Sequence, residues 1–127
     1  MGLDMSAFDL PQEVIGKQLV DLEIPHGATV NELAYWRKFH QLHGWMENLY
    51  RARNGRDEFF NCSTVRLLSA DIDKLEKDAK NGLPAKAGFF FGNREWDDDR
   101  ANELTNFITQ CRKKFEQGQA VYYTSWW

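Results

Sequence analysis

The sequence predicts a single α+β domain in which three helices pack on a small, mainly antiparallel sheet. Two observations favour this class. Apolar residues recur with helical spacing in three segments, and runs rich in β-branched and aromatic residues lie between them. The chain has 127 residues, 43% of them hydrophobic, which is enough to bury a core as one domain over residues 1–127.

The clearest predicted element is a helix over residues 30–53. Thr29 and Glu32 have the spacing of a capping box, in which a hydroxyl and a carboxylate bond the first free amides of a helix. Asn54 and Gly55 favour the left-handed conformation that ends a helix. The apolar positions between these signals follow a helical stripe, at residues 35, 39, 42, 46 and 49. We expect this stripe to be core and the other edge of the helix to be the working surface.

The remaining segments divide into strands and helices by composition and turn residues. A short strand is expected over residues 2–8, and residues 11–28 fit either a helical turn or a strand. The other predicted elements are a strand over 59–67, a helix capped by Ser69 and ended by Asn81–Gly82, a strand over 87–91, a helix begun by Asp97–Asp99 and ended by Gly118, and a strand over 120–127. Because Trp126 and Trp127 carry large apolar areas, we expect both to be buried.

Charge and composition exclude several classes of function. Sixteen Lys and Arg against 19 Asp and Glu give a net charge of -3. The chain therefore has no net positive charge to attract phosphates, and direct nucleic-acid binding is not expected. No apolar run approaches the length of a membrane span and no signal peptide is evident, so we expect a cytoplasmic protein without membrane contact.

The two cysteines, Cys62 and Cys111, form no CxxC pair, which argues against a zinc cage. Cys62 and His43 have the chemistry of a thiolate–imidazole pair, but a structural cysteine is the favoured interpretation. Cys111 lies on the apolar stripe of its predicted helix, so we expect it in the core.

Three polar side chains at helical spacing form one candidate site: His40, His43 and Glu47, near Trp36. Imidazoles and a carboxylate can bind a divalent metal, but zinc helices of the HExxH type space their histidines by four rather than three. Plain surface or pocket-edge residues are therefore the favoured interpretation. No metal and no other cofactor is expected.

A second group combines arginines with aromatic residues: Arg37, Arg94, Trp96, Tyr123 and Trp126. This composition is typical of a protein-interface hot spot or of a stacking pocket for a nucleobase. Aromatic core with a snorkelling cation is an equally open alternative. The predicted binding residues are the two groups together: Trp36, Arg37, His40, His43, Glu47, Arg94, Trp96, Tyr123 and Trp126.

Several short motifs together resemble one lineage of small proteins common in bacteriophages and bacterial genomes. The motifs are MGLD at 1–4, YWRK at 35–38 followed by His43 and Trp45, FFFG at 89–92 and Tyr-x-Ser-Trp at 123–126. The resemblance runs nearly end to end and is weakest between residues 6 and 30. It implies that the residues matching the family's motifs include Tyr35–Lys38, and that Cys62 falls where relatives often have a cysteine.

The chain departs from the family pattern in two places. Members usually carry Asn where this chain has His40 and Ala where it has Phe39, so the resemblance implies that His40 is no family ligand. Around residue 96 relatives tend to read Tyr-Asp-Glu-Trp-Tyr, whereas residues 96–100 here read WDDDR. Members are sometimes labelled phosphoglycerate kinase, but that activity needs two large domains and a phosphate-binding loop, which this sequence lacks.

These observations lead to two hypotheses about function. The leading one is a phage-encoded, non-catalytic protein that binds and inhibits a host protein, with a defence component such as a CRISPR effector as the candidate partner. The alternative is a small enzyme or ligand-binding protein with a pocket formed by His43, Arg37 and Tyr123, which would take a nucleotide or a similar anion. The sequence does not predict the oligomeric state.

Overall fold

The structure is a computed structural model, and it describes residues 2–80, 82–83 and 96–127. In this part of the chain, a four-stranded antiparallel sheet has the order β2-β1-β4-β3. Its strands are β1 (Asp4–Pro11), β2 (Asn31–Arg37), β3 (Thr64–Leu67) and β4 (Gln119–Trp126). The helices are α1 (Gln12–Ile15), α2 (His40–Ala52), α3 (Ser69–Ala79) and α4 (Asp98–Glu116). The predicted α+β class is confirmed.

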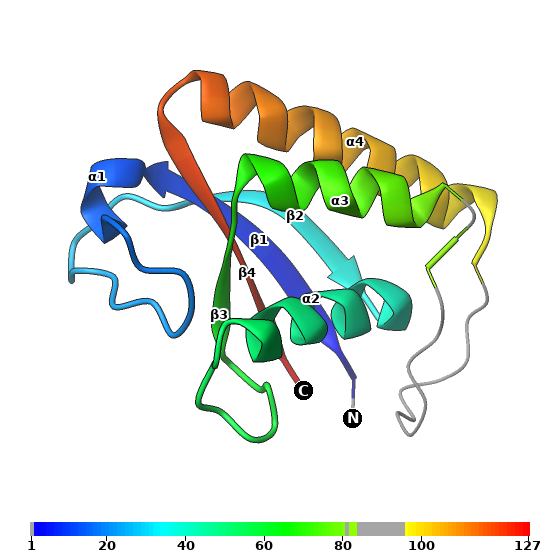
Figure 1. The fold of residues 1–127 in the computed structure, drawn as a ribbon, viewed down its shortest axis with the longest axis horizontal. Coiled ribbons are helices and arrows are strands. Elements are labelled where there is room, and N and C mark those ends of the chain that lie inside the picture. Colours follow the sequence, from blue (N-terminus) through cyan, green and yellow to red (C-terminus); the bar gives the residue numbers. More distant parts are fainter. Residues whose placement is uncertain (1, 81, 84–95) are drawn as a thin grey trace.

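The three long helices, α2, α3 and α4, cover one face of the sheet (Figure 1). Alternate residues of each strand point into the core beneath them, because side chains alternate between the two faces of a strand. In β4, for example, Val121 and Tyr123 belong to this main core. The helices contribute fully buried residues such as Leu42 and Met46 of α2, and Ile72 of α3.

A smaller apolar cluster lies on the other face of the sheet, which we call the outer face. Leu10 of β1 and Tyr122 of β4 pack there with Ile15 of α1. The Phe8 and Tyr122 rings stack with their centroids 5.4 Å apart. Figure 1 shows α1 and the loop after it at one end of the sheet, so this cluster covers only that end of the outer face.

The predicted helix over residues 30–53 is wrong in its first half. Residues 31–37 form strand β2, and the helix begins at His40. β2 pairs with β1 over its whole length, so the hydrogen bonds of this strand are made across the sheet instead of within a helix. The capping box predicted at Thr29 and Glu32 therefore does not form. The predicted stop is confirmed, since Asn54, which follows the C-cap residue Arg53 of α2, has a φ of +63°.

The break between β2 and α2 lies at Lys38, which has a left-handed φ of +55°. Arg100 of α4 holds this break in place, because its guanidinium donates to the carbonyls of Arg37 (2.9 Å) and Lys38 (3.3 Å). The guanidinium also stacks on the Phe39 ring, 4.5 Å from its centroid, and pairs with Glu103 at 3.0 Å. Arg100 is buried, so these contacts take the place of the hydrogen bonds to water that its guanidinium loses on folding.

Other predicted elements differ in their bounds. The strand expected over 59–67 is limited to β3, because Phe60 and Cys62 have φ of +49° and +61°, which extended chain does not allow. The second helix begins at Ser69, but Asp71 provides its cap by accepting the Leu68 amide at 2.7 Å. The strand predicted at 87–91 lies outside the described residues.

The end of the chain also differs from expectation. β4 forms as predicted, and Trp127 is half-buried, with its indole N–H donating to the Phe60 carbonyl at 3.2 Å. Trp126, in contrast, is 67% exposed on the outer face, so the prediction that both tryptophans are buried is wrong. The two tryptophans differ in exposure because successive side chains of an extended chain point to opposite faces of the sheet.

We predict that Arg100→Met lowers the free energy of unfolding by about 2–4 kcal/mol, because it removes charged hydrogen bonds and leaves buried carbonyls without them. Chemical denaturation measures this loss. Arg112→Met is the matched control: Arg112 pairs with Asp73 and Glu76 at the surface, where water screens the interaction, so its loss should be much smaller. Equal losses from the two variants would contradict the role given to Arg100.

Candidate functional site

The helix edge predicted as the working surface is largely inside the protein. Trp36 packs edge-on against Phe107, with ring centroids 4.8 Å apart, and is buried in the main core. His43 is 2% exposed, and Glu47 is buried beside Arg51, to which it pairs at 3.2 Å. The expectation that these three residues offer an exposed contact surface is therefore wrong. Trp36 is buried because it lies on the helix-covered face of strand β2.

Two of the three residues in the alternative site do meet. The His43 Nδ1 atom lies 2.7 Å from the Tyr123 hydroxyl, beneath α2 and beside the Phe60 ring. Burial raises the pKa of Tyr123 well above its usual value, and the negative charge of Glu47 adds to this effect. Arg37 does not join them, because its side chain is 65% exposed on the outer face. The pair thus has the position of a buried structural hydrogen bond, and the predicted three-residue pocket is not assembled.

The other predicted residues are spread over the fold. His40 is the first residue of α2 and is half-buried. Trp96 is half-buried at the start of the segment leading to α4, with its ring centroid 5.8 Å from that of Phe39. Arg94 lies outside the described residues. Within the residues that the structure describes, no three His, Cys, Asp or Glu side chains gather closely enough to hold a metal ion.

A different group of residues comes together on the uncovered end of the outer face. Strand register places them in two rows across β2, β1 and β4, because residues opposite one another in a sheet project from the same face. We call this group the outer-face patch, and its rows are Arg37–Asp4–Trp126 and Tyr35–Ser6–Thr124. Tyr35 is 54% exposed and Trp126 is 67% exposed, so two large aromatic side chains face solvent on this patch.

Asp4 organises the polar part of the outer-face patch. Its carboxylate accepts a hydrogen bond of 2.5 Å from the Tyr35 hydroxyl and lies 4.0 Å from Arg37 Nε. The bond to Asp4 raises the pKa of Tyr35, so the hydroxyl stays protonated and directed toward β1. One cation and one anion are paired here. The patch therefore combines exposed aromatic area with a polar centre that has no net charge.

Sequence reasoning found two members of this patch and missed two others. Arg37 and Trp126 were both predicted as binding residues. Tyr35 was assigned to the core stripe of a helix, and Asp4 was not considered. The signal that identifies Tyr35 is the period-two alternation Tyr35–Trp36–Arg37, which sends the first and third residues to one face of a strand.

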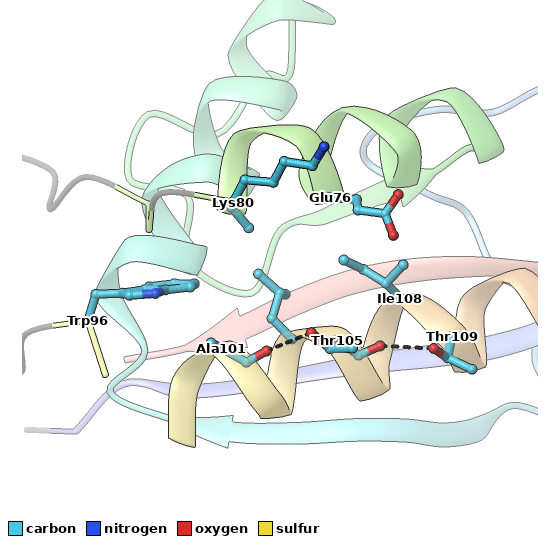
Figure 2. Close-up of a pocket in the computed structure, with 9 residues that line it drawn as sticks. Glu76, Lys80, Trp96, Ala101, Thr105, Ile108 and Thr109 are labelled. Atoms are coloured by element: carbon cyan, nitrogen blue, oxygen red, sulfur yellow. Dashed lines mark hydrogen bonds between the residues drawn. The ribbon is translucent and has the colours of Figure 1, made fainter. Parts of the chain in front are cut away.

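Two cavities lie between helices on the other side of the molecule. The one between α3 and α4 has a volume of about 270 Å³, with Trp96 at one end and Glu76 and Lys80 along α3 (Figure 2). The Thr105 and Thr109 hydroxyls on its α4 wall donate to carbonyls of their own helix, at 3.0 and 3.1 Å (Figure 2). These hydroxyls are thus already engaged, and this wall brings no nucleophile–base pair together.

The larger cavity lies between α2 and α3 and has a volume of about 440 Å³. Trp45, Leu49 and Leu83 make it mainly apolar. Asp78 lies at its polar edge, where it accepts from the Trp45 indole at 2.9 Å and from Lys74 at 2.6 Å. Both contacts lower the pKa of Asp78, that of Lys74 more, so this carboxylate is a stable acceptor and a poor proton donor.

Comparisons of the chain with known protein families, with curated proteins and with solved structures found no match. The resemblance to the phage-associated lineage therefore stays a prediction. Among the described residues, no helix combines the length and apolar character that crossing a bilayer requires.

The buried Tyr123 predicts how stability depends on pH. Its pKa is raised on folding, so its contribution to stability is complete below the unfolded-state pKa of about 10 and is lost as the pH rises toward the folded-state value. We expect the free energy of unfolding to fall above about pH 10, and Tyr123→Phe to make this fall less steep. Denaturation curves between about pH 8 and pH 11 measure both slopes.

Tyr122→Phe provides the comparison for this experiment. Tyr122 also has a raised pKa from burial, but it lies on the outer face and is less deeply enclosed. It should change the alkaline slope less than Tyr123→Phe does. If Tyr123→Phe has the same alkaline slope as the wild-type protein, the prediction is contradicted, because ionisation of the Tyr123 hydroxyl then does not destabilise the folded state.

Proposed function

We propose that this chain is a non-catalytic protein that binds another protein through the outer-face patch. The observation that carries the proposal is the exposure of Tyr35 and Trp126 on the same uncovered end of a sheet, next to Arg37. Trp, Tyr and Arg are the residue types that contribute most to binding at protein interfaces. When a partner covers large aromatic side chains, their apolar area leaves water, and this lowers the free energy of the complex.

The shape of the patch also suits a protein partner. The aromatic side chains stand at opposite corners, and the shorter side chains of Ser6 and Thr124 lie in the same row as Tyr35. Both aromatic side chains project from paired strands, and each has only two side-chain torsions, so covering them costs less conformational entropy than covering longer, flexible side chains. Because Asp4 and Arg37 already balance each other, we expect a partner surface that is mainly apolar at its centre and has no strong net charge.

The buried position of His43 and Tyr123 supports binding over catalysis. A general base needs to come within hydrogen-bond reach of a substrate proton, and this histidine is enclosed between α2 and the sheet. The resemblance to the phage-associated lineage leads us to propose a host protein as the partner, with a defence component as one candidate. That part of the proposal rests on the resemblance alone.

We predict that Trp126→Ala weakens binding to the partner by at least about 2 kcal/mol, roughly thirtyfold in dissociation constant, while leaving the fold intact. The measurement is a two-step one. Affinity purification from a bacterial host lysate first identifies a stoichiometric partner. Titration calorimetry with the purified partner then compares the wild type with the variant.

Phe59→Ala is the matched control. Phe59 is 64% exposed, nearly as much as Trp126, but it projects from the loop between α2 and β3 and not from the sheet. Binding should be unaffected by this change if the outer-face patch is the contact surface. A partner that binds Trp126→Ala as tightly as wild type, or no stoichiometric partner at all, would contradict the proposal.

A further inference from the structure

Within the part of the chain that the structure describes, strand β2 forms one edge of the sheet, and its hydrogen-bonding pattern shows which backbone groups face outward. The Lys38 amide donates to the Leu3 carbonyl at 2.9 Å, so residue 38 is turned toward β1. Bonded and non-bonded pairs alternate along an antiparallel ladder. Trp36 is therefore turned toward β1 as well, and the N–H and C=O groups of Tyr35 and Arg37 point away from the sheet.

This edge is accessible along most of its length. The residues of β2 and the turn after it that are exposed to solvent are Asn31, Glu32, Tyr35, Arg37 and Lys38. The Arg37 carbonyl accepts from Arg100, which closes the edge at that point. The open part is therefore centred on Tyr35. An edge with unpaired donors and acceptors is a template for another strand, and this part of β2 contains no proline or glycine to prevent pairing.

We propose that a second copy of this chain pairs antiparallel with β2, with the two-fold axis passing through Tyr35. In this register each Tyr35 exchanges both backbone hydrogen bonds with its counterpart, and the two aromatic side chains lie directly opposite each other. The arrangement is isologous, as the interfaces of closed dimers are. The result is a continuous eight-stranded sheet, twice the four strands of one copy.

Charge complementarity favours a second copy over an unrelated strand. A bulge makes Leu33 an extra residue in the β1–β2 pairing, so Glu32 and Arg37 lie equally far from Tyr35 along the edge. Antiparallel pairing about Tyr35 therefore places Glu32 of one copy opposite Arg37 of the other, and the two-fold axis repeats this contact at the far end.

Dimerisation goes beyond the proposed binding function and can fail independently of it. Pairing at β2 would place the outer-face patches of both copies on one continuous sheet, which doubles the surface available to a partner. Trp126 lies on β4, two strands away from the proposed dimer edge. Its substitution therefore tests partner binding, whereas changes to the β2 edge test association between copies.

The first experiment measures the mass of the full chain by light scattering and sedimentation at roughly 10–200 μM. We expect a species of twice the 14.9 kDa chain mass. Tyr35→Pro removes the outward N–H without touching a backbone hydrogen bond to β1, and should raise the dimer dissociation constant at least about tenfold. Tyr35→Val is the matched control, since it also loses the aromatic ring and hydroxyl but keeps the N–H and the strand preference; it should dimerise more tightly than Tyr35→Pro. Circular dichroism verifies that both variants fold.

A second experiment tests the register by charge. Glu32→Lys should weaken the dimer several-fold, because it places like charges at both ends of the interface, and combining it with Arg37→Glu should restore most of the affinity. A monomeric wild-type protein throughout this concentration range would overturn the proposal. So would equal dimerisation of Tyr35→Pro and Tyr35→Val, or a Glu32→Lys variant that dimerises as well as wild type.

Discussion

The contact of Arg100 with the chain between β2 and α2 determines much of the rest of this structure. The guanidinium bonds the carbonyls of Arg37 and Lys38 and stacks on Phe39, so α4 is fixed to the point where the chain turns from sheet to helix. This turn fixes the register of β2 on β1. Register decides which side chains enter the core, because a shift of one residue exchanges the two faces of a strand. Trp36 is therefore buried, and Tyr35 and Arg37 are exposed.

The two faces of the sheet consequently have different roles. One face is sealed by three helices, and several of its polar residues contact one another within the protein, as the His43–Tyr123 hydrogen bond and the contact of Asp9 with Lys114 (3.6 Å) illustrate. Among the described residues, the other face is covered only at the end where α1 and the following loop pack. The aromatic residues at the open end remain in contact with water, which is costly for a protein unless another molecule covers them. This asymmetry is the physical basis for the proposal that the outer face is the contact surface.

Much of the architecture could be predicted from local signals. The capping residue Asp97, which accepts the Arg100 amide at 2.8 Å, and the apolar spacing of Leu104, Ile108 and Cys111 predicted α4 correctly. The predicted helix end at Asn54 and the predicted strand after Gly118 are also confirmed. These signals are reliable because each depends on residues a few positions apart. The segment from Asn31 to Phe39 gave the opposite result, since its helical stripe was real in sequence but its partner strand β1 lies more than twenty residues earlier.

By itself, the sequence determined the α+β class, the last two long helices, the central position of apolar residues such as Leu42 and Met46, and the presence of Arg37 and Trp126 among the candidate contacts. The tertiary structure alone decided which face each aromatic residue occupies, and so buried Trp36 with His43 and exposed Tyr35 beside Asp4. The reason is that pairing between distant strands satisfies the backbone hydrogen bonds of residues 31–37 and buries Trp36 at the same time. Neither contribution is visible in a window of neighbouring residues.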